Sequence, residues 1–124
     1  MEVRINVETP WRLWTFLEGI PRLEILYHSI HYLDLVRSFL GNPEKVYASS
    51  IKHPKMLELA QTRSTIILDY PEHVQARVLT NHGHEFGLEK QESYLKLEGT
   101  KGAIKIRIGL SMDYPRGLPP KFEY

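Results

Sequence analysis

The sequence predicts an α+β fold, in which a largely antiparallel, open-faced sheet of about six strands carries helices packed on one face. Two features of the chain lead to this class. One long helical pattern lies in the first third, from about Leu23 to Leu40, and the second half consists of short segments rich in β-branched residues. A chain of 124 residues is large enough to bury one core, so we expect a single domain over residues 1–124.

The first and last predicted strands show the clearest alternation of apolar and polar residues, which is typical of a strand with one buried face. In residues 2–8 (EVRINVE) every second residue is apolar, and in GAIKIRIGL the isoleucines occupy every second position. Gly99 and Gly102 favour a tight hairpin between the last two strands. The remaining four strands are predicted in EKVYASSIK, TRSTIILDY, EHVQARVLT and ESYLKLEG.

The polar residues of these strands should share the face of the sheet that the helices leave open. Such a polar face is either solvated or part of a polar interface. Its predicted members are Arg4, Gln75, Arg77, Tyr94, Lys96, Lys105 and Arg107.

On a helical wheel the predicted helix has two adjoining apolar sides, which together span roughly 220°. A helix that packs on one sheet needs an apolar stripe of only about 100°. Two explanations are open for the second side: the preceding segment Trp11–Phe16 covers it, or a second domain does. The first side consists of Leu26, Ile30, Leu33, Val36 and Leu40, and the second of Ile25, Tyr32, Leu35 and Phe39.

The remaining narrow stripe of the helix carries Tyr27, His31, Asp34 and Ser38. Residues three and four apart on a helix are neighbours, so Asp34 can orient the His31 imidazole and raise its basicity. A general acid–base histidine needs such a partner. The same spacing fits an ordinary polar pair, and spacing alone leaves both interpretations open.

Other kinds of site find less support in the sequence. His28 with His31 and His82 with His84 form two histidine pairs, but no H-E-x-x-H signature is present and nothing in the sequence joins the pairs, so we predict no metal site. Ser29 lies inside the predicted helix and not on an exposed elbow, which disfavours a hydrolase. The chain has no G-x-G-x-x-G or P-loop motif, so we expect it to bind no nucleotide cofactor alone.

Composition excludes further classes of protein. A net charge of +1 does not indicate nucleic-acid binding. No apolar run approaches the roughly 18 residues that a membrane span needs. The N-terminal residues lack an apolar signal core and the chain has no cysteine, so we expect a cytoplasmic location.

Two segments of the chain resemble parts of a known family. HSIHYLDLVRSFLGNPEKVYA resembles the helix and following strand in the C-terminal domain of the glucose-fructose oxidoreductase / inositol dehydrogenase (Gfo/Idh/MocA) family, where H-x-x-D-x-x-R-x-x-x-G-x-P precedes a strand ending in V-x-A. YLKLEGTKGAIKI is similar to the strand–G-T-x-G–strand hairpin near the end of that domain. The first pattern consists here of His31, Asp34, Arg37, Gly41, Pro43, Val46 and Ala48.

The resemblance implies that the chain is the C-terminal half of a two-domain dehydrogenase. Family members pair an N-terminal Rossmann domain, which binds NAD or NADP, with a domain for substrate binding and for oligomerisation through the sheet. On this basis the Rossmann domain is absent from these residues, and the chain alone is inactive and binds no cofactor. The parent enzyme would act on a sugar, a cyclitol or a related hydroxy or keto compound, and its Rossmann domain would cover the second apolar side of the helix.

The same resemblance assigns roles to the polar stripe. His31 is the expected proton-transfer residue, and Asp34 is expected to orient it. Where the family often has an aspartate this chain has Tyr27, so the parent either acts on a different substrate or has lost dehydrogenase chemistry. The aromatic rings of Trp11 and Trp14 can stack on a sugar ring or belong to the core. The predicted substrate-binding residues are Tyr27, His28, Trp11, Arg12 and Trp14.

A competing interpretation makes the chain a non-enzymatic dimerisation or ligand-binding module that buries its open sheet face against a partner. The segments TPWRLWTF and TNHGHEFG are interpreted as pocket or interface segments under either hypothesis.

Overall fold

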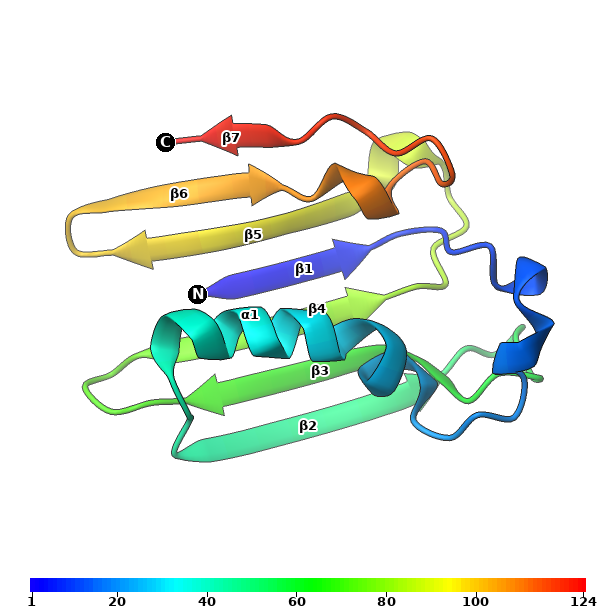
Figure 1. Ribbon diagram of the computed structural model, residues 1–124, viewed down its shortest axis with the longest axis horizontal. Helices are drawn as coiled ribbons and strands as arrows, with labels where there is room; N and C mark the ends of the chain where they lie inside the picture. The colour runs from blue at the N-terminus through cyan, green and yellow to red at the C-terminus, as the bar shows by residue number, and fades with distance from the viewer.

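A computed structural model describes residues 1–124 as one seven-stranded sheet with a helix on one face (Figure 1). The order of the strands across the sheet is β2-β3-β4-β1-β5-β6-β7. The strands are β1 (Glu2–Asn6), β2 (Lys45–Lys52), β3 (Gln61–Asp69), β4 (Gln75–Asn81), β5 (Glu92–Gly99), β6 (Gly102–Arg107) and β7 (Lys121–Glu123). The α+β class is therefore confirmed.

The sheet differs from the prediction in two respects: it has seven strands and not about six, and it is mixed, because β1 pairs with β4 in parallel. The chain crosses from β1 through the helix to β2 at the sheet edge and then returns as the antiparallel meander β2–β3–β4. Two reversals give β4 the direction of β2, so β4 reaches β1 in parallel. The seventh strand, β7, is a three-residue edge strand whose sequence is too short to show alternation.

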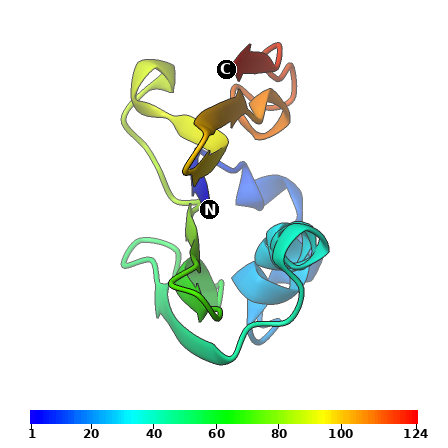
Figure 2. The ribbon, with the colours of Figure 1, turned by 90° about the vertical axis from the view of Figure 1, so that its left-hand side faces the viewer.

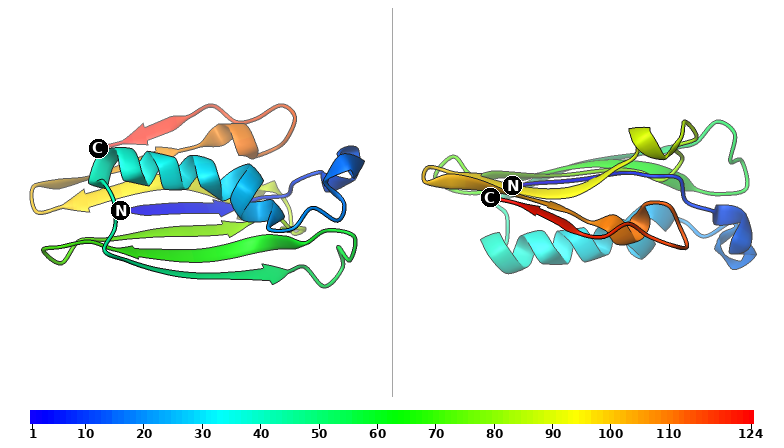
Figure 3. Two further views of the ribbon diagram at one scale, coloured as in Figure 1. Left: turned by 60° about the horizontal axis from the view of Figure 1, so that its bottom comes forward. Right: turned by 90° about the horizontal axis from the view of Figure 1, so that it is seen from above.

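The helical segment covers the predicted range but is not regular. Leu23 and Glu24 are helical, a π-helical turn follows over Ile25–Ser29, and the α-helix α1 spans Ile30–Leu40. Gly41 ends α1 with a φ of 75°, a conformation that a residue without Cβ adopts readily. Figures 2 and 3 show α1 on one side of the sheet only. No helix of the chain combines the length and the apolar character needed to cross a membrane.

The core lies between α1 and the sheet. Val36 is the fully buried residue of α1, and partly buried side chains beside it pack on the same core. The sheet contributes alternate residues of β1, β3 and β4, as the period of two requires. The core cluster consists of Val3, Ile5, Val7, Val36, Ile66, Leu68, Tyr70, Ala76, Val78, Leu95 and Met112.

The segment before the helix forms a second, smaller core and leaves apolar residues on both flanks of the helical segment uncovered. Two 3₁₀ turns, Trp11–Leu13 and Thr15–Leu17, bury Trp11 and Leu17 against Leu23 and Leu59. The apolar residues of the helix outside the sheet contact remain exposed in the chain: Leu26 by 53%, Ile30 by 45%, Leu35 by 36% and Phe39 by 57%. Of the two explanations for the broad apolar arc, cover by Trp11–Phe16 is therefore wrong.

The strand register places all seven predicted polar residues on the sheet face opposite α1. Toward the β2 edge the same face carries the apolar residues Tyr47, Ile51, Ile67 and Leu79. Its charges form short cross-strand contacts. Arg4 Nε lies 2.6 Å from Glu92 Oε2, Arg77 lies 2.8 Å from Glu2, and the Tyr94 hydroxyl donates to Glu2 at 2.6 Å. These pairs are partly solvated, so each adds little stability, about 1 kcal/mol or less.

Candidate functional site

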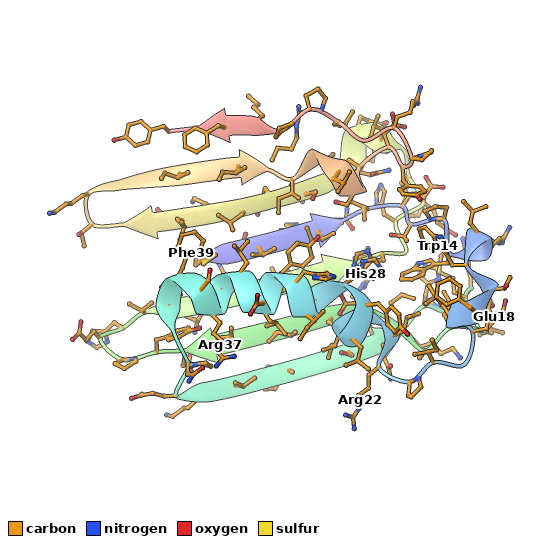
Figure 4. All side chains as sticks on the ribbon, viewed as in Figure 1. Trp14, Glu18, Arg22, His28, Arg37 and Phe39 are labelled. Atoms are coloured by element: carbon orange, nitrogen blue, oxygen red, sulfur yellow. The ribbon has the colours of Figure 1, made fainter.

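A cavity of about 230 Å³ opens at the end of the sheet where the π turn, the segment after β1, the loop after β4 and the segment after β6 meet. Figure 4 shows Trp14 and His28 at this end of the sheet. At about 30 Å³ for each water in liquid, the volume corresponds to roughly eight waters, which is enough for a small ligand of one ring. The lining residues are Glu8, Thr9, Pro10, Trp14, His28, Tyr32, His82, Ile108, Leu110, Ser111 and Tyr114.

A fully buried acid–base pair lies at the floor of the cavity. Glu24, from the start of the helix, is 0% exposed, and His82, from the loop after β4, is 1% exposed. His82 Nε2 lies 3.5 Å from Glu24 Oε1, and the Ser29 hydroxyl donates to the same oxygen at 2.7 Å. Glu24 Oε2 and His82 Nε2 have no hydrogen-bond partner of their own. A buried carboxylate is tolerated only beside such polar groups.

The environment of Glu24 decides its charge. Burial on its own raises the pKa of this carboxyl group, but the polar side chains of His82, Ser64 and Ser29 outweigh burial and lower the pKa below its ordinary value. Glu24 is therefore ionised at neutral pH, and it places a negative charge against the His82 ring.

His28 stacks on His82 at the cavity wall. The ring centroids are 4.2 Å apart with an interplanar angle of 38°, and Trp11 meets both imidazoles edge-on at 5.3 and 5.8 Å. Burial of its ring lowers the pKa of His28 to about 4. His28 is therefore neutral at pH 7, and its imidazole can both donate and accept hydrogen bonds inside the cavity.

His82 has a second polar neighbour on the cavity side. Its Nδ1 lies 3.1 Å from Thr9 Oγ1, and its backbone carbonyl accepts a hydrogen bond from Trp11 Nε1 at 3.0 Å. The ring thus contacts the Thr9 hydroxyl through Nδ1 and faces the Glu24 carboxylate at 3.5 Å through Nε2. This arrangement can exchange a proton between the cavity and a buried charge.

Aromatic rings close the cavity on its outer side. Trp14 and Tyr114 pack edge-to-face with centroids 5.4 Å apart. Burial, with a contribution from the charge of Glu24, raises the pKa of Tyr32, so its hydroxyl remains a neutral donor and acceptor. The walls therefore combine flat apolar surfaces with a few polar atoms, which is typical of a small-molecule site.

The structure divides the residues that the sequence predicted for the site. His28 and Trp14 line the cavity, and Trp11 packs behind it. Arg12 and Tyr27 are exposed and do not line it.

The two predicted catalytic residues also lie outside the cavity. His31 and Asp34 are exposed on the outer side of the helical segment, together with Tyr27 and Ser38. Their placement away from the core agrees with the predicted wheel, and their catalytic roles remain predictions.

Sequence analysis missed the residues that complete the cavity. His82 was noted only as half of a histidine pair, and Glu24, Thr9 and Tyr32 were not identified. The signal for Glu24 was a carboxylate among apolar residues one turn before His28, which on its own indicates no partner.

The four histidines considered for a metal do not converge. His28 and His82 stack, whereas His31 is exposed and His84 contacts Asn6 Nδ2 at 3.3 Å and the carbonyl of Gly87 at 3.2 Å. No group of three or more His, Cys, Asp or Glu side chains is arranged to hold a metal ion.

Comparison with known proteins gives a structural match. No protein-family model matches the chain, and no curated protein sequence does. Among solved structures, an oxidoreductase from Agrobacterium radiobacter in complex with NAD⁺, L-tartaric acid and magnesium matches with a TM-score of 0.68 and 21% identity. The match covers 99% of this chain and 37% of that one. The chain thus shares the fold of a part of that protein and spans little more than a third of its length.

Proposed function

We propose that the chain is the substrate-binding and oligomerisation domain of an NAD(P)-dependent oxidoreductase of the Gfo/Idh/MocA type. The substrate would be a sugar, a cyclitol or a related hydroxy or keto compound. The fold supports this proposal, because nearly the whole chain matches a part of a larger oxidoreductase that binds NAD⁺. The motif resemblance around His31 and in the β5–β6 hairpin supports it independently.

The observation that carries the proposal is the set of exposed apolar residues that flank the polar stripe of the helical segment on both sides. Leu26, Ile30, Leu35 and Phe39 form no part of the cores of the chain and are between 36% and 57% exposed. Several large apolar side chains on one exposed element favour an interaction surface over a solvated one. A Rossmann domain docked here would lie next to Tyr27, His31 and Asp34, and these exposed residues would then line the cleft between the domains.

Within that cleft we assign His31 to proton transfer and Asp34 to its orientation. Tyr27 would contact the substrate from the same side. His28 and Trp14 would contact a ligand in the separate cavity on the inner side of the segment, with Trp11 supporting them, and the exposed Arg12 would contact substrate only from outside that cavity. Asp34 makes no hydrogen bond to His31 in the chain, so this role requires it to turn toward the imidazole when the cleft forms. A histidine with such a partner is suited to move a proton to or from a substrate hydroxyl or carbonyl oxygen.

The residues of this chain do not fit the nicotinamide cofactor itself. A dinucleotide needs a glycine-rich turn at a helix N-terminus for its pyrophosphate, and no such turn exists in the sequence. The cavity of about 230 Å³ is also below the usual size of drug-sized ligand sites, roughly 300 to 1,000 Å³. NAD or NADP would therefore be bound by the other domain of the parent.

Calorimetry with NADH on the purified chain tests whether cofactor binding belongs to the other domain of the parent. We expect no measurable heat of binding at high micromolar concentration. Binding at micromolar affinity would contradict the proposal that this chain is the half without the cofactor. The coding sequence around these residues gives a second test, because a strand–G-x-G-x-x-G–helix unit is expected upstream in the parent.

The alternative, a non-enzymatic dimerisation or ligand-binding module, has one observation in its favour. The sheet face opposite α1 carries the predicted polar residues on β1, β4, β5 and β6, and no α-helix of the chain covers it. Both hypotheses predict self-association through this face. Sedimentation therefore tests whether the face is an interface, and it does not distinguish the two hypotheses. A strictly monomeric species at high micromolar concentration would count against the interface. Cofactor-dependent turnover by the parent would separate the enzyme from the module.

A further inference from the structure

We infer that Thr9, His82 and Glu24 form a proton-accepting relay for the hydroxyl group of a small, uncharged, single-ring ligand in the cavity. The inference rests on the proposed function only in taking the cavity as a ligand site. It adds a proton acceptor distinct from His31, on the opposite side of the helical segment.

Thr9 is the member of the relay that contacts the ligand. It lines the cavity, and its Oγ1 lies 3.1 Å from His82 Nδ1. Because Glu24 is a carboxylate and accepts only, the proton of a neutral His82 belongs on Nε2, which faces Glu24. Nδ1 is then an acceptor, and the Thr9 hydroxyl donates to it. The lone pairs of Thr9 Oγ1 remain available to a ligand hydroxyl.

Glu24 stabilises the charge that the relay would generate. Proton uptake at Nδ1 makes His82 an imidazolium whose Nε2–H faces a fully buried carboxylate at 3.5 Å. An ion pair in such a site interacts more strongly than one in water. Both Nε2 and Glu24 Oε2 have no other hydrogen-bond partner, so the pair is available to tighten on protonation.

The other titratable groups around His82 do not compete for the proton. His28, stacked at 4.2 Å, has a pKa of about 4 and stays neutral, because two adjacent imidazolium rings would repel each other. Tyr32 has a raised pKa and also remains neutral. Trp11, which packs edge-on at 5.8 Å, does not titrate.

The walls of the cavity define the class of ligand. No Lys or Arg lines it, and the exposed carboxylate of Glu8 stands at its edge, so an anionic ligand would enter without a counter-charge. Trp14, Tyr114 and Tyr32 offer flat surfaces for one ring. The volume excludes a ligand as large as a dinucleotide.

The proton transfer is balanced without a further reactant. The ligand O–H bond breaks as its proton moves to Thr9 Oγ1, and the Thr9 O–H bond breaks as its own proton moves to His82 Nδ1. The products are a ligand oxyanion, an unchanged Thr9 hydroxyl and an imidazolium paired with Glu24.

The test uses 4-nitrophenol, a single-ring hydroxyl compound whose ionised form absorbs visible light. Burial alone raises the pKa of a bound phenol, so a decrease identifies a proton acceptor. With the unmodified chain we expect the acid dissociation constant of the bound probe to increase by about ten-fold or more over the free probe. In Thr9→Val, which removes the hydroxyl and keeps the shape, we expect binding to persist and the increase to disappear.

Ser111→Ala is the matched control, because it removes another hydroxyl that lines the cavity and leaves His82 untouched. It should retain the increase. Three results would each overturn the relay. The acid dissociation constant of the bound probe could be unchanged or lower, it could change equally in Thr9→Val and in the unmodified chain, or the probe could fail to bind at millimolar concentration. None of these results bears on NADH binding, so failure of the relay and failure of the proposed function are distinguishable.

Discussion

His28 and His31 are three residues apart in one helical segment, yet the structure gives them opposite settings. His28 is largely buried, stacks on His82 and has a pKa lowered to about 4. His31 is exposed and has no hydrogen-bond or ion-pair partner in the chain. The side of the helix on which a histidine lies, and not its residue type, therefore decides what each ring can contact.

The two sides of the segment differ in what covers them. The side of His28 closes a cavity with residues that come from distant parts of the sequence, and this site is complete in the chain. The outer side also carries the exposed residues Leu26 and Ile30, and under the proposed function a partner domain would cover them. The predictions below separate the two sides.

The largest expected effect is on stability when the buried pair is broken. His82→Ala leaves the Glu24 carboxylate buried without its partner, which should lower the free energy of unfolding by about 3 to 5 kcal/mol. His31→Ala removes an exposed side chain and should change it by no more than about 0.5 kcal/mol. Urea denaturation of both variants measures the difference. Equal losses would show that the two sides are not distinct.

A somewhat smaller effect is expected from acid. The pKa of His28 is 6.5 in a model compound and about 4 in the fold, so the unfolded chain binds its proton more tightly. Stability is therefore complete above pH 6.5 and falls as the pH decreases toward 4, by about 3 kcal/mol for this group. His28→Gln should remove that part of the pH dependence, and His31→Gln should preserve it. Urea titrations at several pH values provide the measurement, and identical slopes in both variants would refute the assignment.

The smallest expected effect compares apolar residues on the two sides. Val36 is fully buried against the sheet, so Val36→Ala should lower the free energy of unfolding by about 2 kcal/mol. Ile30 is 45% exposed, and Ile30→Ala should reduce it by less than about 1 kcal/mol in this chain. In the parent protein the Ile30 effect should grow, because the partner domain would bury it. Thermal melting of both forms would reveal the change, and an Ile30 effect of the same size in both would argue against a docked domain.

The fold was largely predictable because its signals are local. Alternation identified the first and last of the six predicted strands, length and β-rich composition identified the other four, and the apolar spacing together with Gly41 indicated the limits of the helix. The parallel pairing of β1 with β4 was not predictable in this way, since it depends on where the meander after the helix returns. The strand β7 is too short for a periodic signal.

The site was predictable only in part, for a physical reason. Sequence spacing places residues on one element, so His28 was identified beside His31, and Trp14 beside Trp11. The pairing of Glu24 with His82 joins the start of the helix to the loop after β4, and only the sheet topology brings these segments together. The π turn over Ile25–Ser29 also departs from the regular wheel, because it adds a residue to the turn that carries His28.

The central claim is that the exposed stripe of Tyr27, His31 and Asp34 faces a cleft completed by a partner domain. The most direct test measures turnover and melting temperature of His31→Ala in the full-length parent. Proton transfer by a positioned histidine contributes about 10² to 10⁴ in rate, so turnover should fall by that factor while the melting temperature stays nearly unchanged. Asp34→Asn should reduce turnover less, since it acts through His31. A His31→Ala enzyme that melts many degrees lower but retains near-normal turnover would contradict the account.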